Sequence, residues 1–243
     1  MTAPPIDAMN DTVTRNRLLA ALPVNELELV ESRATLVTLN RRDVLYDAGQ
    51  PLEHVHFIVD GIVSILSLVG ERTGVETATI GREGTVGMAA FHGVPSAPER
   101  AIVQVPGSAY RLDVADFREM LPNTPSLEAL LHRYAVVMFS LASQNSACNR
   151  KHSIEARCAR WLLMVADRLD TSTMELTHDF VAQMLGVRRA SVTEALGALE
   201  KQGLIQTGRG RITVVQREGL EAVSCACYSI IRNVMKGMLD NQN

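Results

Sequence analysis

The chain has 243 residues, room for two domains of the usual ~100–200 residues, and 47% of them are hydrophobic. No apolar run approaches the ~20 residues of a membrane span, and the N-terminus lacks the features of a secretion signal. Four cysteines without a CxxC pair exclude a disulfide framework, and Cys225-x-Cys227 is too short and isolated to predict a zinc site. We therefore expect a cytoplasmic protein without a metal or a membrane contact.

The net charge of −3 would by itself argue against a nucleic-acid partner, but the charge is unevenly distributed. The segment from Thr177 to Arg217 carries a net charge of +3, which leaves −6 for the remainder. A basic segment on an acidic chain is typical of a DNA-binding module attached to a sensor domain.

The first half of the chain predicts short helices over 15–34 and then a β domain up to about Leu112. Short apolar runs at nearly even spacing, separated by turn signals, favour an antiparallel β-sandwich or barrel. The predicted strands are Leu36–Leu39, Val55–Val59, Ile62–Val69, Ala78–Ile80 and Ala101–Val105. The predicted turns are at Asp47-Ala48-Gly49, Asp60-Gly61, Gly70-Glu71 and Gly107.

After Pro125 the pattern becomes that of one long helix with a narrow apolar seam, spaced 4, 3, 4, 3, 4, 3. Such an a/d seam predicts pairing with the same helix of a second copy, and a polar residue at an a position can fix the register. A single helix buried on the β domain is the alternative. The seam residues are Leu127, Leu131, Tyr134, Met138, Leu141, Asn145 and Cys148.

A hinge is expected over 149–153, with Ser153 as the N-cap of the next helix. The C-terminal tail from Leu220 onward carries Cys225, Cys227 and an apolar helix that we expect to pack on the DNA-binding part.

Residues 177–212 predict a helix-turn-helix followed by a wing. Thr177 can cap the first helix, and Gly186 stands where the turn needs positive φ. The second helix is expected over about 188–202, with Gly203 ending it. A hairpin with Gly208-Arg209-Gly210 at its tip follows. A small helical subdomain without a DNA role is the alternative reading.

The exposed N-terminal face of the second helix is predicted to read DNA. Arg189 is the candidate for bidentate pairing with guanine, worth ~1–3 kcal/mol of discrimination, and Glu194 could accept from cytosine. Phosphate contacts would supply affinity without sequence information. The residues expected on phosphates or beside the reading arginine are Arg188, Ser191, Thr193, Arg209 and Arg211.

With these motifs in this order, the chain resembles the cyclic-AMP receptor and fumarate-nitrate regulator (Crp/Fnr) family of bacterial transcription regulators. The matching segments are Asp47-Ala48-Gly49, Phe57–Gly61, Val181-Ala182-Gln183 and Leu204-Ile205. The resemblance implies an α+β fold. It divides into a cyclic-nucleotide-binding-like β-roll (a jelly roll) over 15–125, a dimerisation helix over 126–150 and a winged helix-turn-helix over 151–243. It also implies a homodimer on a palindromic double-stranded DNA site, with RNA polymerase as a further partner.

The family's cyclic-nucleotide pocket is expected to be degenerate here. Where nucleotide binders have a glutamate for the ribose, this chain has Thr85 after Gly84, or Met88 in the other alignment; Arg100 survives, and Ala101 replaces a hydroxyl. Bonds to charged groups are worth ~1.5–3 kcal/mol each, so these losses weaken nucleotide binding. On the long helix Ser143 remains of the purine-binding hydroxyls. We expect no cofactor, with a cyclic-nucleotide-responsive regulator as the alternative.

Two further departures narrow the function. The first cysteine is Cys148, so the N-terminal iron–sulfur cluster of the family's oxygen-sensing branch is not expected. Ala190 stands where nucleotide-responsive relatives have a glutamate, so the half-site should keep a guanine and differ elsewhere.

A rival interpretation is an enzyme, because His54-Val55-His56 and Asp60 faintly resemble the metal-binding motif of cupins. Asp60 is more simply a turn residue, and we expect no catalytic activity. A second rival is a nucleotide-binding module without DNA function.

Overall fold

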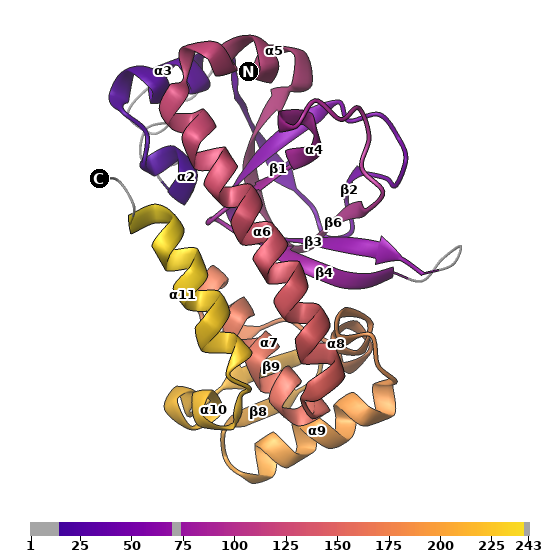
Figure 1. Cartoon of the computed structure of the whole chain (residues 1–243). Helices are drawn as coiled ribbons and strands as arrows, with labels where there is room; N and C mark the ends of the chain where they lie inside the picture. Colours follow the sequence, from indigo (N-terminus) through magenta and orange to yellow (C-terminus); the bar gives the residue numbers. More distant parts are fainter. Residues whose placement is uncertain (1–14, 70–73, 241–243) are drawn as a thin grey trace. The chain divides into compact units, whose positions relative to one another are not determined.

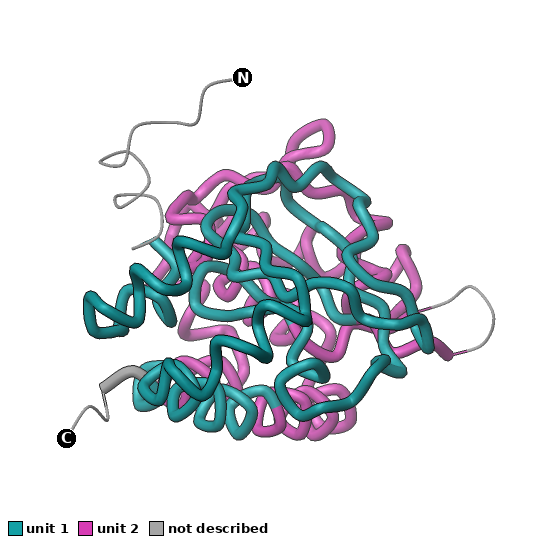
Figure 2. The backbone as a smooth tube through the Cα atoms, turned by 90° about the horizontal axis from the view of Figure 1, so that it is seen from above, with its two compact units in different colours: residues 1–65, 79–138, 235–243 teal, residues 66–78, 139–234 magenta. Residues whose placement is uncertain are grey.

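The structure is a computed structural model that describes residues 15–69 and 74–240 (Figure 1). The chain divides into two compact units, shown in Figure 2: the first holds residues 1–65, 79–138 and 235–243, the second 66–78 and 139–234. Each unit therefore combines segments far apart in the sequence. The N-terminal stretch before Arg15 and the predicted turn at Gly70-Glu71 lie outside the described residues.

The first unit is built on an antiparallel β-roll, as the sequence predicted. The strand order is β1-β6-β3-β4, with β2 paired to β6 and β5 to β3. The elements from Arg17 to Lys151, in chain order, are α2 (Arg17–Ala20), α3 (Val24–Arg33), β1 (Thr35–Leu39), β2 (Val44–Tyr46), β3 (His54–Leu68), β4 (Gly74–Ile80), β5 (Thr85–Val86), α4 (Met88–Phe91), β6 (Arg100–Asp113), α5 (Val114–Met120), the 3-10 helix η1 (Leu121–Asn123) and α6 (Pro125–Lys151). Of these, the end of β3 from Leu66, β4 up to Ala78 and α6 from Phe139 belong to the second unit.

The turn predicted at Asp60-Gly61 is wrong, because β3 runs through these residues without reversing. Gly61 has φ +86°, and a Cβ there would lie 2.5 Å from the carbonyl oxygen of Val105. On the neighbouring strand β6, a Cβ at Gly107 would lie 2.1 Å from the carbonyl oxygen of Asp60. The two glycines mark a close approach of two paired backbones, which the sequence pattern could not distinguish from a turn.

Asn16 fixes the start of the first unit's core. Its Oδ1 caps α2 by accepting from the amides of Leu18 and Leu19, both at 3.1 Å. Its Nδ2 donates to the carbonyl oxygens of Ile58 and Gly84 at 2.8 and 2.9 Å. This buried amide is fully bonded, so it stabilises the loop before β5 rather than costing folding free energy.

The second unit contains the winged helix-turn-helix. Its elements are α7 (Ile154–Leu169), β7 (Thr173–Met174), α8 (His178–Leu185), α9 (Arg189–Lys201), β8 (Ile205–Gly208), β9 (Arg211–Val214), α10 (Arg217–Val223) and α11 (Cys227–Asp240). The small sheet has the order β7-β9-β8. Helix α6 continues to Lys151, so the hinge predicted over 149–153 is limited to His152 and Ser153. The hydroxyl of Ser153 accepts from the amide of Ala156 at 3.3 Å, which confirms it as the cap of α7.

The C-terminal helix α11 belongs to both units. Its beginning lies beside the C-terminal part of α6 (Figure 1), where Gln144 Nε2 donates to Cys227 Sγ at 3.0 Å. Its last turns belong to the first unit, where Met238 is buried in the cluster that includes Tyr134 and Val137. The expectation that the tail packs on the DNA-binding part therefore describes only its first half.

Among the described residues, no helix has the length and apolarity needed to cross a membrane.

Candidate functional site

Helices α8 and α9 meet at a turn of the kind the sequence predicted. The hydroxyl of Thr177 caps α8 by accepting from the amide of Phe180 at 3.2 Å. Gly186 adopts the left-handed conformation with φ +63°, and Val187 N donates back to the Ala182 carbonyl at 3.0 Å. Glycine reaches this conformation without steric cost, so the turn directs the chain into α9.

Helix α9 has one buried face and one exposed face. Val192, Ala195, Leu196 and Leu199 are buried, as their spacing predicted. Its first helical residue is Arg189, and Arg188 is an N-cap without a side-chain capping bond. The predicted reading residues lie on the solvent side: Arg188, Arg189, Thr193 and Glu194 are exposed, and Ser191 is half-buried.

Two residues of α8 hold the reading face in place, and the sequence analysis missed both. Asp179 Oδ2 lies 3.3 Å from Arg189 Nη1, with the two side chains 67% and 66% exposed. His178 Nδ1 lies 2.9 Å from the Thr193 hydroxyl. Exposed ion pairs contribute ~0–1 kcal/mol, so Arg189 can exchange Asp179 for a base or a phosphate at little cost. No sequence signal marks these contacts, because they cross the turn.

The wing is a tight hairpin with exposed arginines. Gly203 and Gly210 have φ +73° and +70°, and Arg209 and Arg211 are exposed at the tip. The carboxylate of Glu200 accepts from the amide and hydroxyl of Thr207 at 2.6 and 2.8 Å. The bond from the Thr207 amide lowers the pKa of Glu200. These bonds tie the wing to the end of α9, so the two parts form one surface.

The arginine predicted for the nucleotide pocket is bound within the chain. Arg100 donates from Nε and Nη2 to the two carboxylate oxygens of Asp47 at 2.8 and 2.9 Å. The hydrogen bond from Arg100 lowers the pKa of Asp47. A bidentate pair is the geometry in which guanidinium binds phosphate, so Asp47 occupies the donors that a cyclic phosphate would need.

Gly84 and Thr85, two residues predicted for the same pocket, are covered by α6. The hydroxyl of Thr85 donates to the His56 carbonyl at 3.0 Å, and Tyr134 donates from its hydroxyl to the Thr85 carbonyl at 3.3 Å. A Cβ at Gly84 would lie 2.1 Å from the Tyr134 hydroxyl oxygen. Ala101 is completely buried. Ser143, the fifth predicted pocket residue, is exposed and belongs to the other unit.

The histidine pair that resembled a cupin motif has other partners. His56 is buried, and desolvation lowers its pKa to about 3, so the ring is neutral at physiological pH. His54 Nε2 lies 3.1 Å from Asp113 Oδ1. Asp60 accepts from Arg15 at 3.2 Å.

The predicted dimer seam lies inside the chain's own core. Leu127, Leu131, Tyr134, Leu141 and Cys148 are each at most 2% exposed, and Met138 is partly buried. Asn145 donates to the Thr77 carbonyl at 2.8 Å and accepts from Arg160 at 2.9 Å. A 3.5-residue period marks a buried face without showing whether a partner or the same chain covers it. Within the single chain these residues are buried, and their pairing with a partner helix stays a prediction.

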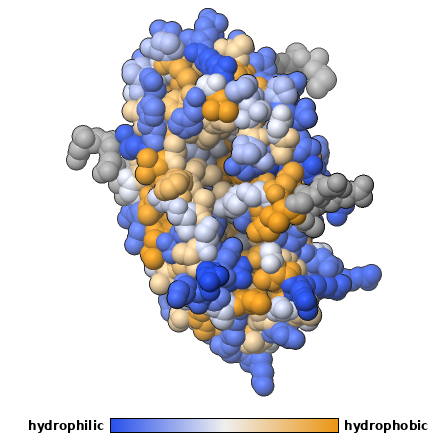
Figure 3. Space-filling view, turned by 45° about the vertical axis from the view of Figure 1, so that its right-hand side comes forward, coloured by the Kyte–Doolittle hydropathy of each residue, from blue (hydrophilic) through white to orange (hydrophobic). Residues whose placement is uncertain are grey.

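A different face of α6 carries exposed apolar side chains. Val136 is 66% and Phe139 75% exposed. Figure 3 shows one face of the molecule, on which apolar patches stand among polar residues. Other exposed large hydrophobic residues include Val24, Leu36, Val44, Val69, Val94, Val215, Ile230 and Val234.

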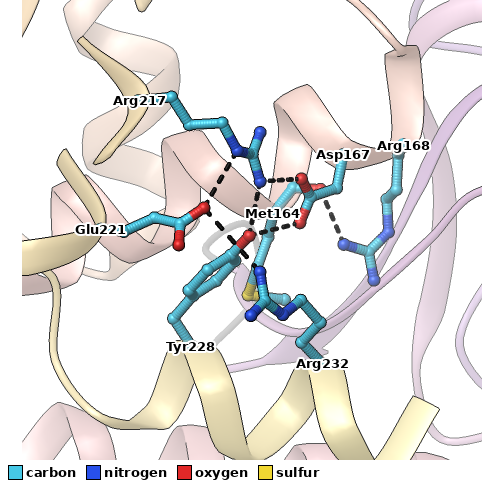
Figure 4. A network of polar contacts seen from close by, with 7 residues as sticks. All are labelled: Met164, Asp167, Arg168, Arg217, Glu221, Tyr228 and Arg232. Atoms are coloured by element: carbon cyan, nitrogen blue, oxygen red, sulfur yellow. Dashed lines mark hydrogen bonds and ion pairs between the residues drawn. The ribbon is translucent and has the colours of Figure 1, made fainter. Parts of the chain in front are cut away.

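A polar network fixes the start of α11 within the second unit (Figure 4). Arg217 donates to Asp167 and, at 2.7 Å, to the Tyr228 hydroxyl, which donates to Asp167 at 2.8 Å. Arg217 also donates to Glu221 at 3.0 Å, and Arg232 lies 5.2 Å above the Tyr228 ring. Burial raises the pKa of Tyr228.

The structure also brings together four side chains that the sequence analysis kept apart. Cys148 and His152 from the end of α6 meet Cys225 and Cys227 from the start of α11, with their donor atoms within 4.8 Å of one another. The missed signal is the spacing Cys148-x3-His152, which places both side chains on one face of a helix.

Two family models match this chain: a cyclic nucleotide-binding domain over residues 36–124 and a Crp-like helix-turn-helix domain over residues 156–223. Among curated proteins, the chain is 24% identical over 188 residues to the global nitrogen regulator of Nostoc sp., which spans 73% of this chain and 83% of the relative.

Three solved structures share the fold. FixK2 from Bradyrhizobium japonicum has a TM-score of 0.69 at 20% identity and covers 79% of this chain and 98% of its own. A Crp/Fnr-family regulator from Eubacterium rectale has a TM-score of 0.66 at 15% identity, covering 86% and 98%. The c-di-GMP-responsive global regulator CLP from Xanthomonas campestris has a TM-score of 0.66 at 12% identity, covering 79% and 99%.

A cyclic-nucleotide-binding-type β-roll followed by a Crp-like winged helix-turn-helix defines a DNA-binding transcription regulator. Within that class, the chain belongs to the Crp/Fnr family.

Proposed function

We propose that this regulator binds a palindromic DNA site as a homodimer, without a cyclic-nucleotide cofactor. The observation that carries the proposal is the exposed N-terminus of α9, with Arg188 and Arg189 beside the basic wing. We assign the sensor to residues 15–125, the dimerisation helix to 126–150 and the DNA-binding domain to 151–243. Two recognition helices about 34–36 Å apart would then read two half-sites.

Within the interface, Arg189 reads guanine, and the exposed Glu194, five residues further along α9, is the candidate to accept from cytosine. Ser191, Thr193, Arg209 and Arg211 position the backbone. Ala190 provides no polar group, so the base next to the guanine is recognised less strictly. Because phosphate contacts release counterions, affinity should fall steeply with salt.

The test is fluorescence anisotropy with a duplex selected from random sequences, measured at several salt concentrations. Arg189→Ala should weaken specific binding by roughly 5–150-fold, the equivalent of ~1–3 kcal/mol, and relax preference at one position of each half-site. Lys236→Ala, which also removes one exposed positive charge, is the control and should leave specificity unchanged. Equal affinities of wild type and Arg189→Ala would contradict the proposal.

The dimer contact is proposed on the face of α6 that carries Val136 and Phe139, in place of the seam buried in the chain's own core. Light scattering should show a dimer for the wild type and a monomer for Val136→Glu/Phe139→Glu. Val24→Glu alters a side chain that is 72% exposed on α3 and should stay dimeric. A double variant that remains a dimer would place the contact elsewhere.

The absence of a nucleotide effector is proposed from the Asp47–Arg100 pair and from the cover that Tyr134 places over Gly84. Calorimetry with cyclic AMP, cyclic GMP and cyclic-di-GMP should show no binding at concentrations where the apo protein binds DNA. Cyclic-di-GMP is included because the related CLP responds to it. Tight binding of any of the three, with increased DNA affinity, would instead support the nucleotide-responsive alternative.

RNA polymerase as a partner and a cytoplasmic location are proposed with this role. A catalytic role is not proposed. The relatives are transcription regulators, and the buried His56 and the Asp113-paired His54 do not form a metal centre with Asp60.

A further inference from the structure

Cysteine and histidine side chains from two distant segments meet at the junction of α6 and α11. Cys148 Sγ lies 3.5 Å from Cys225 Sγ, and Cys227 Sγ lies 3.5 Å from His152 Nδ1. All four donor atoms lie within 4.8 Å of one another. We propose that Cys148, His152, Cys225 and Cys227 form a structural Zn²⁺ site of the Cys3His type.

The donor spacing fits a single tetrahedral ion. Zinc binds thiolate sulfur at about 2.3 Å and imidazole nitrogen at about 2.0–2.1 Å, so neighbouring donors lie about 3.5–3.8 Å apart. The Cys148–Cys225 and Cys227–His152 distances of 3.5 Å are already in or at the edge of this range, and the remaining donor pairs, all within 4.8 Å, need to close by about 1 Å or less. An iron–sulfur cluster places its thiolates on different iron atoms, and a set of donors this compact favours one metal ion.

The local backbone presents the donors together. The amide of His152 donates to the Cys148 carbonyl at 3.1 Å, which continues the helical spacing and keeps both side chains on one face. The amide of Tyr228 donates to the Cys225 carbonyl at 3.0 Å and closes a turn around Ala226. The exposed Ala226 separates two buried cysteines, so both thiols face the same interior.

The surroundings of the three cysteines are typical of metal-binding thiolates, and differ from those of thiols that only fill an apolar core. Cys148, Cys225 and Cys227 are 0%, 6% and 1% exposed and form a buried cluster of their own beside Ala156. Gln144 Nε2 donates to Cys227 Sγ at 3.0 Å, the kind of outer-shell bond that orients a metal ligand.

Two buried arginines near the cluster favour a negatively charged group beside them. Arg157 and Arg160 are 6% and 4% exposed. Arg157 donates to the Leu185 carbonyl and Arg160 to the amide oxygen of Asn145, which are neutral acceptors. Three thiolates and a neutral imidazole around Zn²⁺ carry a net charge of −1, whereas three thiols and a neutral imidazole without the metal carry none. The metal-bound form therefore places a negative charge beside the two guanidinium groups. A buried positive charge without such a counter-charge costs folding free energy.

The site would be structural because four protein ligands close the coordination shell and leave no position for a substrate. It would join the end of α6 to the start of α11, next to the Asp167–Arg217–Tyr228 network that holds the same turn of α11 (Figure 4). Cys158, buried in α7 and not among the four donors, is expected to remain a free thiol.

The first test is the metal content of the full-length, tag-free protein purified without chelators under anaerobic conditions. We expect about one zinc per chain, and tetrahedral thiolate-type spectra when Co²⁺ is titrated into the apo protein. Protein without bound zinc that also fails to bind Co²⁺ would overturn the proposal. Iron with acid-labile sulfide at this site would also overturn it.

Variants distinguish ligation from folding. Cys225→Ser and His152→Ala should lower zinc affinity by more than the ~10–100-fold expected from loss of an outer-shell bond, which is our expectation for Gln144→Ala. His152→Cys should retain the ion, because four thiolates also form a tetrahedral site. Cys158→Ala is the matched control and should leave the zinc content unchanged.

If Cys225→Ser fails to fold, chelation of the wild type provides the same information: the melting temperature should fall and recover when zinc is added back. Unchanged stability on chelation, or unchanged metal content in every ligand variant, would contradict the site. None of these readouts depends on DNA binding, so failure of the regulatory proposal would leave this one standing.

Discussion

The nucleotide-type pocket and the recognition helix use their polar groups in opposite ways. In the pocket, Arg100 is bound bidentately by Asp47, and Tyr134 covers Gly84 and Thr85. On the recognition helix, Arg189 is two-thirds exposed and held only by an equally exposed Asp179. One chain can therefore keep the guanidinium group of one surface accessible while that of another surface is bound by the chain's own side chains.

The largest effect is expected from Gly84→Ala, which tests how tightly the pocket is filled. The new methyl group would overlap Tyr134, and overpacking of this kind lowers the free energy of unfolding by about 1–3 kcal/mol. Chemical denaturation measures the loss. The double variant with Tyr134→Leu should lose less than the sum of the two single variants. Simple additivity would show that Tyr134 is not the residue that closes the pocket.

Removal of both wing arginines tests the other side of the comparison. Arg209→Ala/Arg211→Ala should weaken binding to the operator and to unrelated duplexes alike, by roughly 10–100-fold at ~0.1 M salt. The slope of log affinity against log salt should become shallower by about 2. If only the operator affinity falls, the arginines read bases and not phosphates.

The buried His56 makes the stability of the first unit depend on pH between about pH 3 and 6.5. Desolvation lowers its pKa from 6.5 to about 3. Below pH 6.5 the unfolded chain takes up a proton that the folded chain refuses, so stability falls with pH down to about 3. The slope from this group is at most ~1.4 kcal/mol per pH unit. His56→Gln should flatten the curve over this range, whereas the exposed His132→Gln should not.

The smallest effect is expected from Asp179→Asn. The exposed pair contributes ~0–1 kcal/mol, so its loss should barely change the free energy of unfolding. DNA affinity should rise by a few-fold, because a negative charge leaves the reading face and Arg189 becomes free. Glu128→Gln, which removes a charge from α6, should not change DNA affinity. Weaker DNA binding by Asp179→Asn would mean that Asp179 positions Arg189 productively.

The sequence predicted the order of domains and the recognition motif because both depend on local signals. Thr177, Gly186 and Gly203 act through their own backbone conformations, so their positions identify the cap, the turn and the helix end. The seam of α6 was recognised as a buried face, but its periodicity carries no information about whether the same chain or a partner covers it. The sequence did not reveal the Cys3His cluster, because Cys148 and Cys225 are 77 residues apart in the chain.

The last turns of α11 have a consequence for biosynthesis. Met238 is 4% exposed in the same cluster as Leu18 and Leu19, which are synthesised before it. Domains generally begin to fold during synthesis, from the N-terminal end. Here the core of the first unit lacks the Met238 side chain until α11 has been synthesised, so a chain truncated before α11 would leave this core incomplete.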